Sequence, residues 1–436
     1  MREKAIAHYD GQIGLPAWPV LAMLWGFPVW WITGMTVIMA GILTVVMVSY
    51  LVIGQTLPVL PGMAALGAFL LWVIACVTMI DSGERLLGYF YRTTILLFVA
   101  TAFVYTVRSA GQLTRRRIVS ALTFIWFFTI IAGVVALIIP EVRLTTPVGM
   151  VLPDGLQSNS YVQDLFFPPM AEIQRPYGSP EIFIRPSAPF PYANSWGVAV
   201  VLLSPVAVAG FLQSRSMALR VAILAAFVVM IPPAMATGNR GMFGALALSG
   251  TYVVVRMVLR NRAAPVLSMG ILGLAGVGAL IASGLLDRIA TRQEYGDSLG
   301  TRGTLYVETI ERTLQSPLLG YGAPRPSLQP EISLGTQGYV WMLMFSYGFV
   351  GLALFLTFLW GTTLRTWRVP GDVDLVLHSV LIAASVVIIV YGLDIMQLLT
   401  IMLVGAVLLR RRHGLEPFDP DDPDELVDIG VTAARG

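Results

Sequence analysis

Long apolar runs recur along almost the whole chain, and they constrain the fold more than any other feature of the sequence. A run of 18 or more apolar residues can cross the hydrocarbon core of a bilayer as a helix. Hydrophobic residues make up 56% of the chain and charged residues 12%, whereas soluble domains carry about 25% charged residues. The sequence therefore predicts an all-α integral membrane protein, folded as a bundle of many transmembrane helices.

The apolar windows predict twelve membrane spans. They cover residues 15–33, 35–54, 59–80, 87–107, 118–139, 193–213, 218–236, 241–259, 265–285, 338–364, 374–393 and 395–410. The N-terminal stretch Met1–Lys4 precedes a long apolar region that has no small-residue cleavage site. This pattern favours a retained first helix over a removed signal peptide.

Arginines gather in the short connections on one side of these spans. They are Arg108, Arg115, Arg116, Arg117, Arg215, Arg220, Arg256, Arg260, Arg262, Arg365, Arg368, Arg410, Arg411 and Arg412. Short loops rich in Lys and Arg stay in the cytoplasm. The pattern therefore predicts a multi-pass plasma-membrane protein with both termini in the cytoplasm.

Two long segments on the other side divide the chain. The predicted parts are N-terminal spans 1–139, a first extracytoplasmic loop 140–192, central spans 193–285, a second extracytoplasmic loop 286–337, C-terminal spans 338–410 and an acidic cytoplasmic tail 411–436. The first loop is rich in proline and aromatic residues, which favours a folded lid. In the second, residues 302–314 can form an amphipathic helix with Tyr306, Ile310 and Leu314 on one face.

No pattern of side chains indicates a metal or another cofactor. His8, His378 and His413 all fall on the predicted cytoplasmic side, and Cys76 has no second cysteine to pair with. Glu308 and Glu311 are spaced i, i+3, so they share a helix face. Such a pair is more often a solvated surface than a cation site, which usually needs six or more oxygen ligands. Nor does any feature indicate a nucleic-acid partner.

Three arginines on the predicted outer side are more informative. Arg185, Arg240 and Arg302 each precede the return of the chain into the membrane. A guanidinium group binds phosphate oxygens in bidentate fashion, so the three predict a cationic cavity suited to a lipid diphosphate. The alternative is that they anchor the protein on phospholipid head groups. Asn194 is positioned to cap the helix that follows Arg185.

Aromatic residues near these arginines suit the binding of sugar rings. Tyr306 and Tyr321 lie in the second outer loop, close in sequence to Arg302. Aromatic belts at the membrane interface explain tyrosines at such places equally well. The sequence alone leaves both interpretations open.

The arginines stand in three short motifs. Thr237–Gly241 reads Thr-Gly-Asn-Arg-Gly; Arg302-x-x-x-Tyr306 is followed by Ser316–Gly322, which reads Ser-Pro-Leu-Leu-Gly-Tyr-Gly; and Arg185–Asn194 contains several prolines. These stretches resemble three elements of the bacterial O-antigen ligase and O-antigen polymerase superfamily. Thr237–Gly241 resembles its Ser-x-Ser-Arg-Gly element, and Arg302-x-x-x-Tyr306 with Ser316–Gly322 resembles its Arg-x-x-x-Trp followed by Pro-Leu-x-Gly-x-Gly. Arg185–Asn194 resembles its Arg-x-x-Gly-x-Phe followed by Pro-Asn. The resemblance covers residues 185–351, and it implies a GT-C-like fold.

The chain departs from the ligase pattern at one point. Ligases of this superfamily carry a His-Asn pair eleven residues before one glycine and fourteen before another. Counting back from Gly348 and Gly351 places Gln337-Gly338 at the position of that pair. The histidine that activates the acceptor in ligases is therefore replaced, which favours a polymerase.

The resemblance implies a metal-independent glycosyltransferase of the bacterial inner membrane. It would transfer glycan from a polyprenyl-diphosphate-linked donor to a hydroxyl of a glycan or lipid acceptor at the outer leaflet, in cell-surface polysaccharide assembly. Arg185, Arg240 and Arg302 would hold the diphosphate, Glu308 or Glu311 would take the acceptor proton, and Gln337 would orient the acceptor. The alternatives are a flippase or transporter of lipid-linked glycan and a non-catalytic membrane scaffold.

Overall fold

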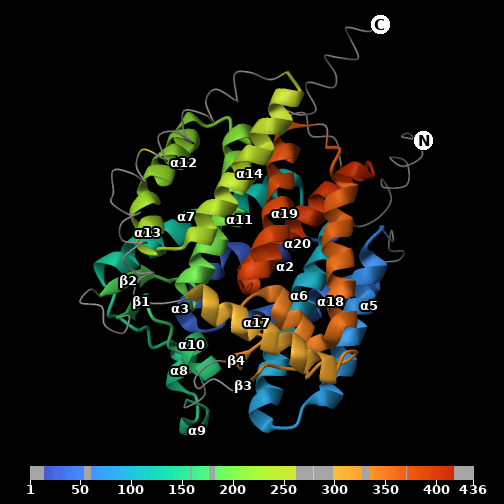
Figure 1. Ribbon diagram of the computed structural model, residues 1–436. Helices are drawn as coiled ribbons and strands as arrows, with labels where there is room; N and C mark the ends of the chain where they lie inside the picture. Colours follow the sequence, from blue (N-terminus) through green and yellow to red (C-terminus); the bar gives the residue numbers. More distant parts are fainter. Residues whose placement is uncertain are drawn as a thin grey trace, which may run out of the picture.

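The chain folds into a bundle of long helices with short helices and two hairpins near one end (Figure 1). The computed structural model describes residues 14–53, 60–157, 160–175, 182–261, 298–326, 333–369 and 371–416, with the single residue 278. In this part of the chain, eight helices are long and apolar enough to cross a membrane. They are α4 (Thr36–Ile53), α6 (Gly83–Arg108), α7 (Arg115–Ile138), α11 (Ala193–Gln213), α12 with α13 (Met217–Val229 and Ile231–Ala236), α14 (Arg240–Leu259), α18 (Tyr339–Arg365) and α19 (Asp372–Val390).

Helices outside these eight occupy three further predicted spans. The first predicted span is broken at Gly26 into α2 (Trp18–Trp25) and α3 (Phe27–Thr33). The third predicted span consists of α5 (Met63–Ala75) and the 3-10 helix η1 (Cys76–Met79), and the last is α20 (Ile395–Arg412). The predicted span 265–285 lies outside the described residues. The prediction of a membrane-embedded helical bundle is thus confirmed, with eight membrane-length helices in the described chain where twelve spans were predicted.

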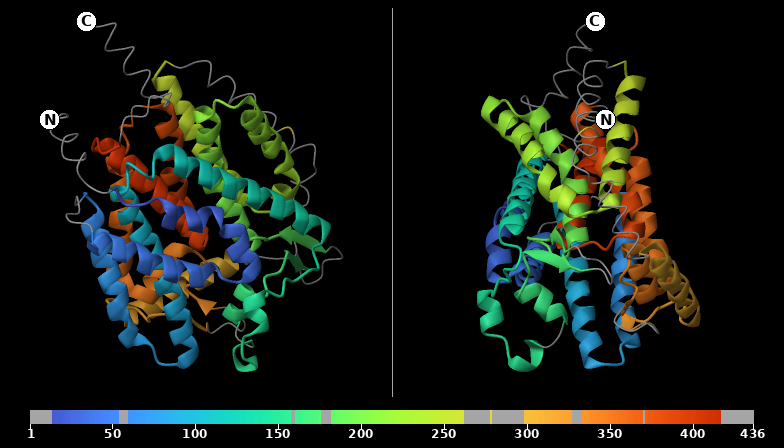
Figure 2. Two further views of the ribbon diagram at one scale, coloured as in Figure 1. Left: turned by 180° about the vertical axis from the view of Figure 1, so that it is seen from behind. Right: turned by 60° about the vertical axis from the view of Figure 1, so that its left-hand side comes forward.

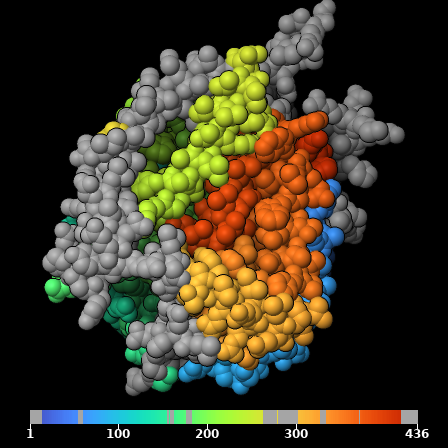
Figure 3. All heavy atoms as spheres, in the orientation of Figure 1, coloured from blue at the N-terminus to red at the C-terminus, as the bar shows by residue number. Residues whose placement is uncertain are grey.

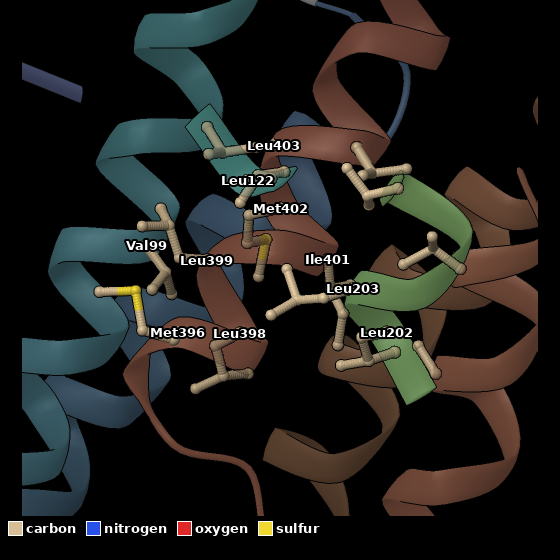
Figure 4. Close-up of a cluster of buried hydrophobic side chains, with 14 of the residues drawn as sticks. Val99, Leu122, Leu202, Leu203, Met396, Leu398, Leu399, Ile401, Met402 and Leu403 are labelled. Carbon is tan, nitrogen blue, oxygen red and sulfur yellow. The ribbon is translucent and has the colours of Figure 1, made fainter. Parts of the chain in front are cut away.

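Helix α20 lies at the centre of the bundle. Every residue from Ile395 to Arg410 is buried, and the helix packs against α6, α11 and α19. Figure 4 shows Leu398, Leu399 and their neighbours on α20 between Val99 of α6 and Leu203 of α11. A helix that is apolar on all sides belongs in a core, and α20 therefore fixes the positions of the helices around it.

Ion pairs join the arginine-rich helix ends to one another. Asp374 at the start of α19 pairs with Arg115 at the start of α7 and with Arg411 at the end of α20, the latter at 2.7 Å. Arg410 donates to the carbonyl oxygen of Thr106 on α6 at 2.9 Å. These contacts bring several of the predicted arginine clusters to one end of the bundle.

The first predicted loop is folded in its described part, at the opposite end of the bundle (Figure 2). It contains the short helices α8 (Pro147–Met150), α9 (Asp154–Gln157) and α10 (Ser160–Phe166). The strands β1 (Ala171–Gln174) and β2 (Phe183–Pro186) form an antiparallel hairpin in which Glu172 lies opposite Arg185. The hairpin packs against α13 and α7, so it connects the loop to the bundle.

The second loop contains the predicted amphipathic helix, α17 (Ser298–Gln315). It lies on the outside of α18 (Figure 3) and is followed by the small hairpin of β3 (Arg325–Pro326) and β4 (Ser333–Leu334). Its buried face carries Leu305, Thr309 and Thr313. Tyr306, Ile310 and Leu314 lie one turn apart along α17, as predicted, but this face is not the buried one: Ile310 and Leu314 are exposed, whereas Tyr306 stacks on Trp341 of α18.

The turn Ser316–Gly322 enters a break in α18. Gly348, inside this helix, has φ 69° and ψ −176°, so the regular hydrogen bonds are interrupted there. The turn replaces them: the backbone N–H of Tyr321 donates to the carbonyl of Phe345 at 2.9 Å, and Phe349 donates to the carbonyl of Pro317 at 2.8 Å. A Cβ atom on Gly348 would lie 2.1 Å from the carbonyl oxygen of Leu318.

We expect Gly348→Ala to destabilise the protein by about 2 kcal/mol or more, because it adds both a positive-φ penalty and a backbone collision. Thermal unfolding of the detergent-solubilised protein measures the effect as a lower melting temperature. Gly250→Ala on α14 is the control, since a Cβ there meets nothing within 4 Å and alanine favours a helix. Equal melting temperatures for Gly348→Ala and the wild type would contradict the packing described.

Candidate functional site

A cavity of about 580 Å³ lies where the two long loops, 140–192 and 286–337, meet the bundle in their described parts. Its lining comes from α6, α10, α11, α17, α18 and α20 and from the turn between α19 and α20. The polar groups on it include Arg92, Asp164, Asn194, Arg302, Gln337 and Asp394. One part of the wall is apolar and consists of Ile95, Leu96, Met342 and Leu398. A mixed lining of this kind is typical of sites for small-molecule and lipid substrates.

Arg302 lines this cavity and has no counter-ion among the described residues. The residue stands near the start of α17, is partly buried, and lines the cavity. Within the described residues, no carboxylate or other acceptor forms an ion pair or hydrogen bond with its guanidinium group. A partly desolvated charge is costly unless it is paired. Among the described residues, Arg302 therefore presents a positive charge to the cavity that no carboxylate neutralises.

The other two predicted arginines lie near the same place, around Tyr391. Burial raises the pKa of the Tyr391 hydroxyl, and the positive charges of Arg302, Arg185 and Arg240 oppose that rise. Arg240 is exposed at the start of α14 and is outside the cavity lining, whereas Tyr391 is part of it. The structure thus brings together three arginines that are far apart in the sequence.

The motif Thr237–Gly241 holds Tyr391 against the start of α14. The Tyr391 hydroxyl donates to Oδ1 of Asn239. The same oxygen caps α14 by accepting the backbone N–H of Met242 at 3.1 Å. A Cβ atom on Gly241 would lie 2.1 Å from the Tyr391 hydroxyl, so only glycine allows this close contact.

Arg185 is buried, and protein acceptors surround its guanidinium group. Nε donates to the carbonyl of Thr237 at 2.7 Å, Nη1 pairs with Glu172 at 2.8 Å, and Nη2 donates to Oδ1 of Asn194 at 3.0 Å. Burial lowers the pKa of Arg185, and the charge of Glu172 opposes this shift. Arg185 is not part of the cavity lining. Its contacts join the β1–β2 hairpin, α11 and the loop before α14.

The predicted helix cap at Asn194 is wrong. Helix α11 begins at Ala193, and its N-cap is Tyr192, whose side chain makes no capping bond. Glu172 takes that role from the hairpin, because its Oε1 accepts the backbone N–H of Ala193 at 3.0 Å. The side-chain oxygen of Asn194 instead accepts from Arg185, and Asn194 lines the cavity.

The remaining predicted residues of the second loop divide into two groups. Gln337 lines the cavity, and its backbone carbonyl accepts from the Tyr306 hydroxyl at 3.2 Å. Glu308 and Glu311 are not in the cavity lining. Tyr321 is buried, with its hydroxyl bonded to the carbonyl of Arg312. Tyr306 and Tyr321 therefore hold the second loop together and do not form part of the cavity wall.

Two carboxyl groups in the cavity were not predicted from the sequence. Burial raises the pKa of Asp164, and the hydrogen bond from the Tyr192 hydroxyl opposes this rise. Burial also raises the pKa of Asp394, and hydrogen bonds from Ser195 and Gln397 oppose it. An acidic residue between two apolar spans is a signal that could have indicated Asp394. Asp164 has no comparable signal, since it lies within a long loop whose folding brings it to the cavity.

Comparisons with known proteins identify no relative of this chain. No family model matches the sequence, and no curated protein is similar to it. Among the described residues, no group of three or more His, Cys, Asp or Glu side chains is arranged to hold a metal ion.

We expect Arg185→Met and Arg302→Met to have different effects on stability. Removing Arg185 leaves Glu172 without its buried partner, which should cost about 3 kcal/mol. Removing Arg302 eliminates a charge that no described side chain pairs with, so stability should be unchanged or higher. Thermal unfolding of the two purified variants in detergent measures both effects. A similar loss in both variants would contradict the different environments of the two arginines.

Proposed function

We propose that the protein is a metal-independent membrane glycosyltransferase. It takes glycan from a polyprenyl-diphosphate-linked donor at the outer leaflet and transfers it to an acceptor hydroxyl. The observation that carries this proposal is Arg302, a cation in a partly apolar cavity with no counter-ion among the described residues. The donor diphosphate supplies an anion beside this guanidinium group.

Arg302 and Arg240 have the roles of diphosphate ligands. When the glycosidic bond to phosphate breaks, negative charge increases on the departing diphosphate, and fixed cations beside it lower the barrier. Arg240 stands at the first turn of α14, where the helix dipole also favours an anion. Arg185 acts indirectly, since its bonds position the loop that carries Arg240.

The cavity suits a substrate that is part lipid and part sugar. The apolar wall of Ile95, Leu96, Met342 and Leu398 is compatible with the first isoprene units of the carrier. The carboxyl and amide groups opposite can hydrogen-bond sugar hydroxyls. The motifs that resemble O-antigen ligases and polymerases support the same class, and Gln337 in place of the ligase histidine favours a polymerase.

One observation keeps a lipid-linked glycan flippase as the second candidate. Arg92 lies within the membrane helix α6 and lines the cavity. Ionisable residues inside membrane spans often mark a transport path. The charged groups Arg302, Asp164 and Asp394 lie outside the membrane-length helices, which favours transfer at the membrane surface over transport through it.

The test is glycan transfer by the purified protein in nanodiscs, with a polyprenyl-diphosphate glycan as donor and EDTA present. We expect the wild type to lengthen the glycan on its carrier. Arg302→Ala and Arg240→Ala should each reduce the rate constant about 100-fold, because each removes a donor that stabilises the departing charge. Arg302→Ala should also weaken donor binding about tenfold or more.

Glu141→Gln, which changes an exposed carboxyl group in the first outer loop, serves as the control and should keep the wild-type rate. A single transfer to a different acceptor would identify a ligase. Loss of activity in EDTA with recovery on adding a divalent cation would contradict metal independence. Absence of product, together with movement of the carrier across the bilayer, would replace the proposal with a flippase.

A further inference from the structure

We infer that Asp394 is the general base that accepts the proton of the acceptor hydroxyl. This inference rests on the proposed function and assigns the residue that the reaction still requires. Asp394 lines the cavity together with Arg302, so the base and the diphosphate ligand face one space. It is the N-cap of α20, the central helix of the bundle, and its position is therefore well fixed.

The two oxygens of the Asp394 carboxyl group have different environments. One accepts the backbone N–H of Gln397 in a capping box, while the Gln397 side chain accepts the backbone N–H of Asp394 at 2.8 Å. The other oxygen, Oδ2, is buried and forms no hydrogen bond of normal geometry within the described chain, although the nearby Ser195 side chain interacts with this carboxyl group and lowers its pKa. A buried polar atom without a partner is costly. The capping role explains the first oxygen and leaves the second to be explained.

An acceptor hydroxyl that donates its proton to Oδ2 satisfies this atom. In the displacement, the hydroxyl oxygen forms a bond to the anomeric carbon, and the bond from that carbon to the diphosphate oxygen breaks. The proton of the hydroxyl passes to Oδ2, and the electron pair of the broken bond leaves on the diphosphate, next to Arg302. The carboxylate becomes a carboxylic acid and returns its proton to water before the next turnover.

The other candidates are less suitable. Gln337 lines the cavity, but an amide cannot take a proton. Glu308 and Glu311 lie outside the cavity lining. Asp164 is the alternative carboxyl group in the cavity, but it stands on the short helix α10, whereas Asp394 caps the central helix α20. The Oδ2 atom of Asp164 accepts a hydrogen bond from the Tyr192 hydroxyl.

The pH dependence follows from the burial of this carboxyl group. Burial raises the pKa of Asp394, and the negative charge of Asp164 raises it further, whereas Ser195 and Gln397 lower it. A base must be ionised, so kcat should be high above this pKa and fall as the pH drops through it. A raised pKa brings the base closer to the optimum for proton transfer near neutral pH. The other ionisable groups lining the cavity are Tyr91, Arg92, Asp164, Tyr192, Arg302, Tyr339 and Tyr391.

Asp394→Asn separates the chemical role from the structural one. Asparagine caps a helix as well as aspartate does, so the substitution keeps the cap and removes the base. We expect kcat to fall about 100-fold or more, with donor affinity and melting temperature close to those of the wild type. The acid limb of the pH profile should disappear in Asp394→Asn and persist in Asp164→Asn. Asp394→Ser, which also retains a capping side chain, provides a second variant should the first be unstable.

The outcomes distinguish this inference from the proposed function. If the wild type transfers glycan and Asp394→Asn keeps its rate and its acid limb, the inference is overturned while the glycosyltransferase stands. Loss of the acid limb in Asp164→Asn would assign the base to Asp164 instead. A wild type that binds the donor and yields no product with any acceptor would overturn both. Glu141→Gln is again the control and should keep both the rate and the pH profile.

Discussion

The structure depends on how the backbone of α18 is completed at Gly348. In a membrane, water is not available to satisfy an interrupted helix, so the protein must supply the missing hydrogen bonds. The turn Ser316–Gly322 provides them, with N–H groups for the carbonyls of Phe345 and Ser346 and a carbonyl for the N–H of Phe349. The turn follows α17 directly, so the same bonds fix α17 on the bundle and place Arg302 at the cavity.

Burial and pairing give Arg185 and Arg302 different roles. Arg185 is enclosed by Glu172, Asn194 and the carbonyl of Thr237, so its charge is neutralised within the fold. Arg302 lines a cavity and has no such partner in the described chain. The first arginine therefore supplies rigidity and the second supplies affinity for an anion. The type of residue does not distinguish these roles, because the difference lies entirely in the surrounding acceptors.

The cavity combines segments that are stabilised independently of one another. Asp394 caps a helix buried on all sides, Tyr391 is held by Asn239 at the start of α14, and Gln337 is held through its backbone by Tyr306. Each group is fixed by contacts that do not involve the cavity. Such preorganisation reduces the cost of arranging catalytic groups around a substrate, and it leaves the cavity-facing atoms available for a ligand.

The sequence by itself determined the membrane environment, the helical class, the grouping of several arginine clusters and the existence of α17, because hydropathy and helical periodicity are local properties of the chain. It also indicated Arg302, Asn194 and Gln337, which do line the cavity. Only the tertiary structure decided that Glu172 and not Asn194 caps α11, and that protein acceptors enclose Arg185. It also decided which carboxyl groups line the cavity: Asp164 and Asp394 do, whereas Glu308 and Glu311 do not. These outcomes depend on which distant segments meet in the fold, and no local pattern of residues encodes that.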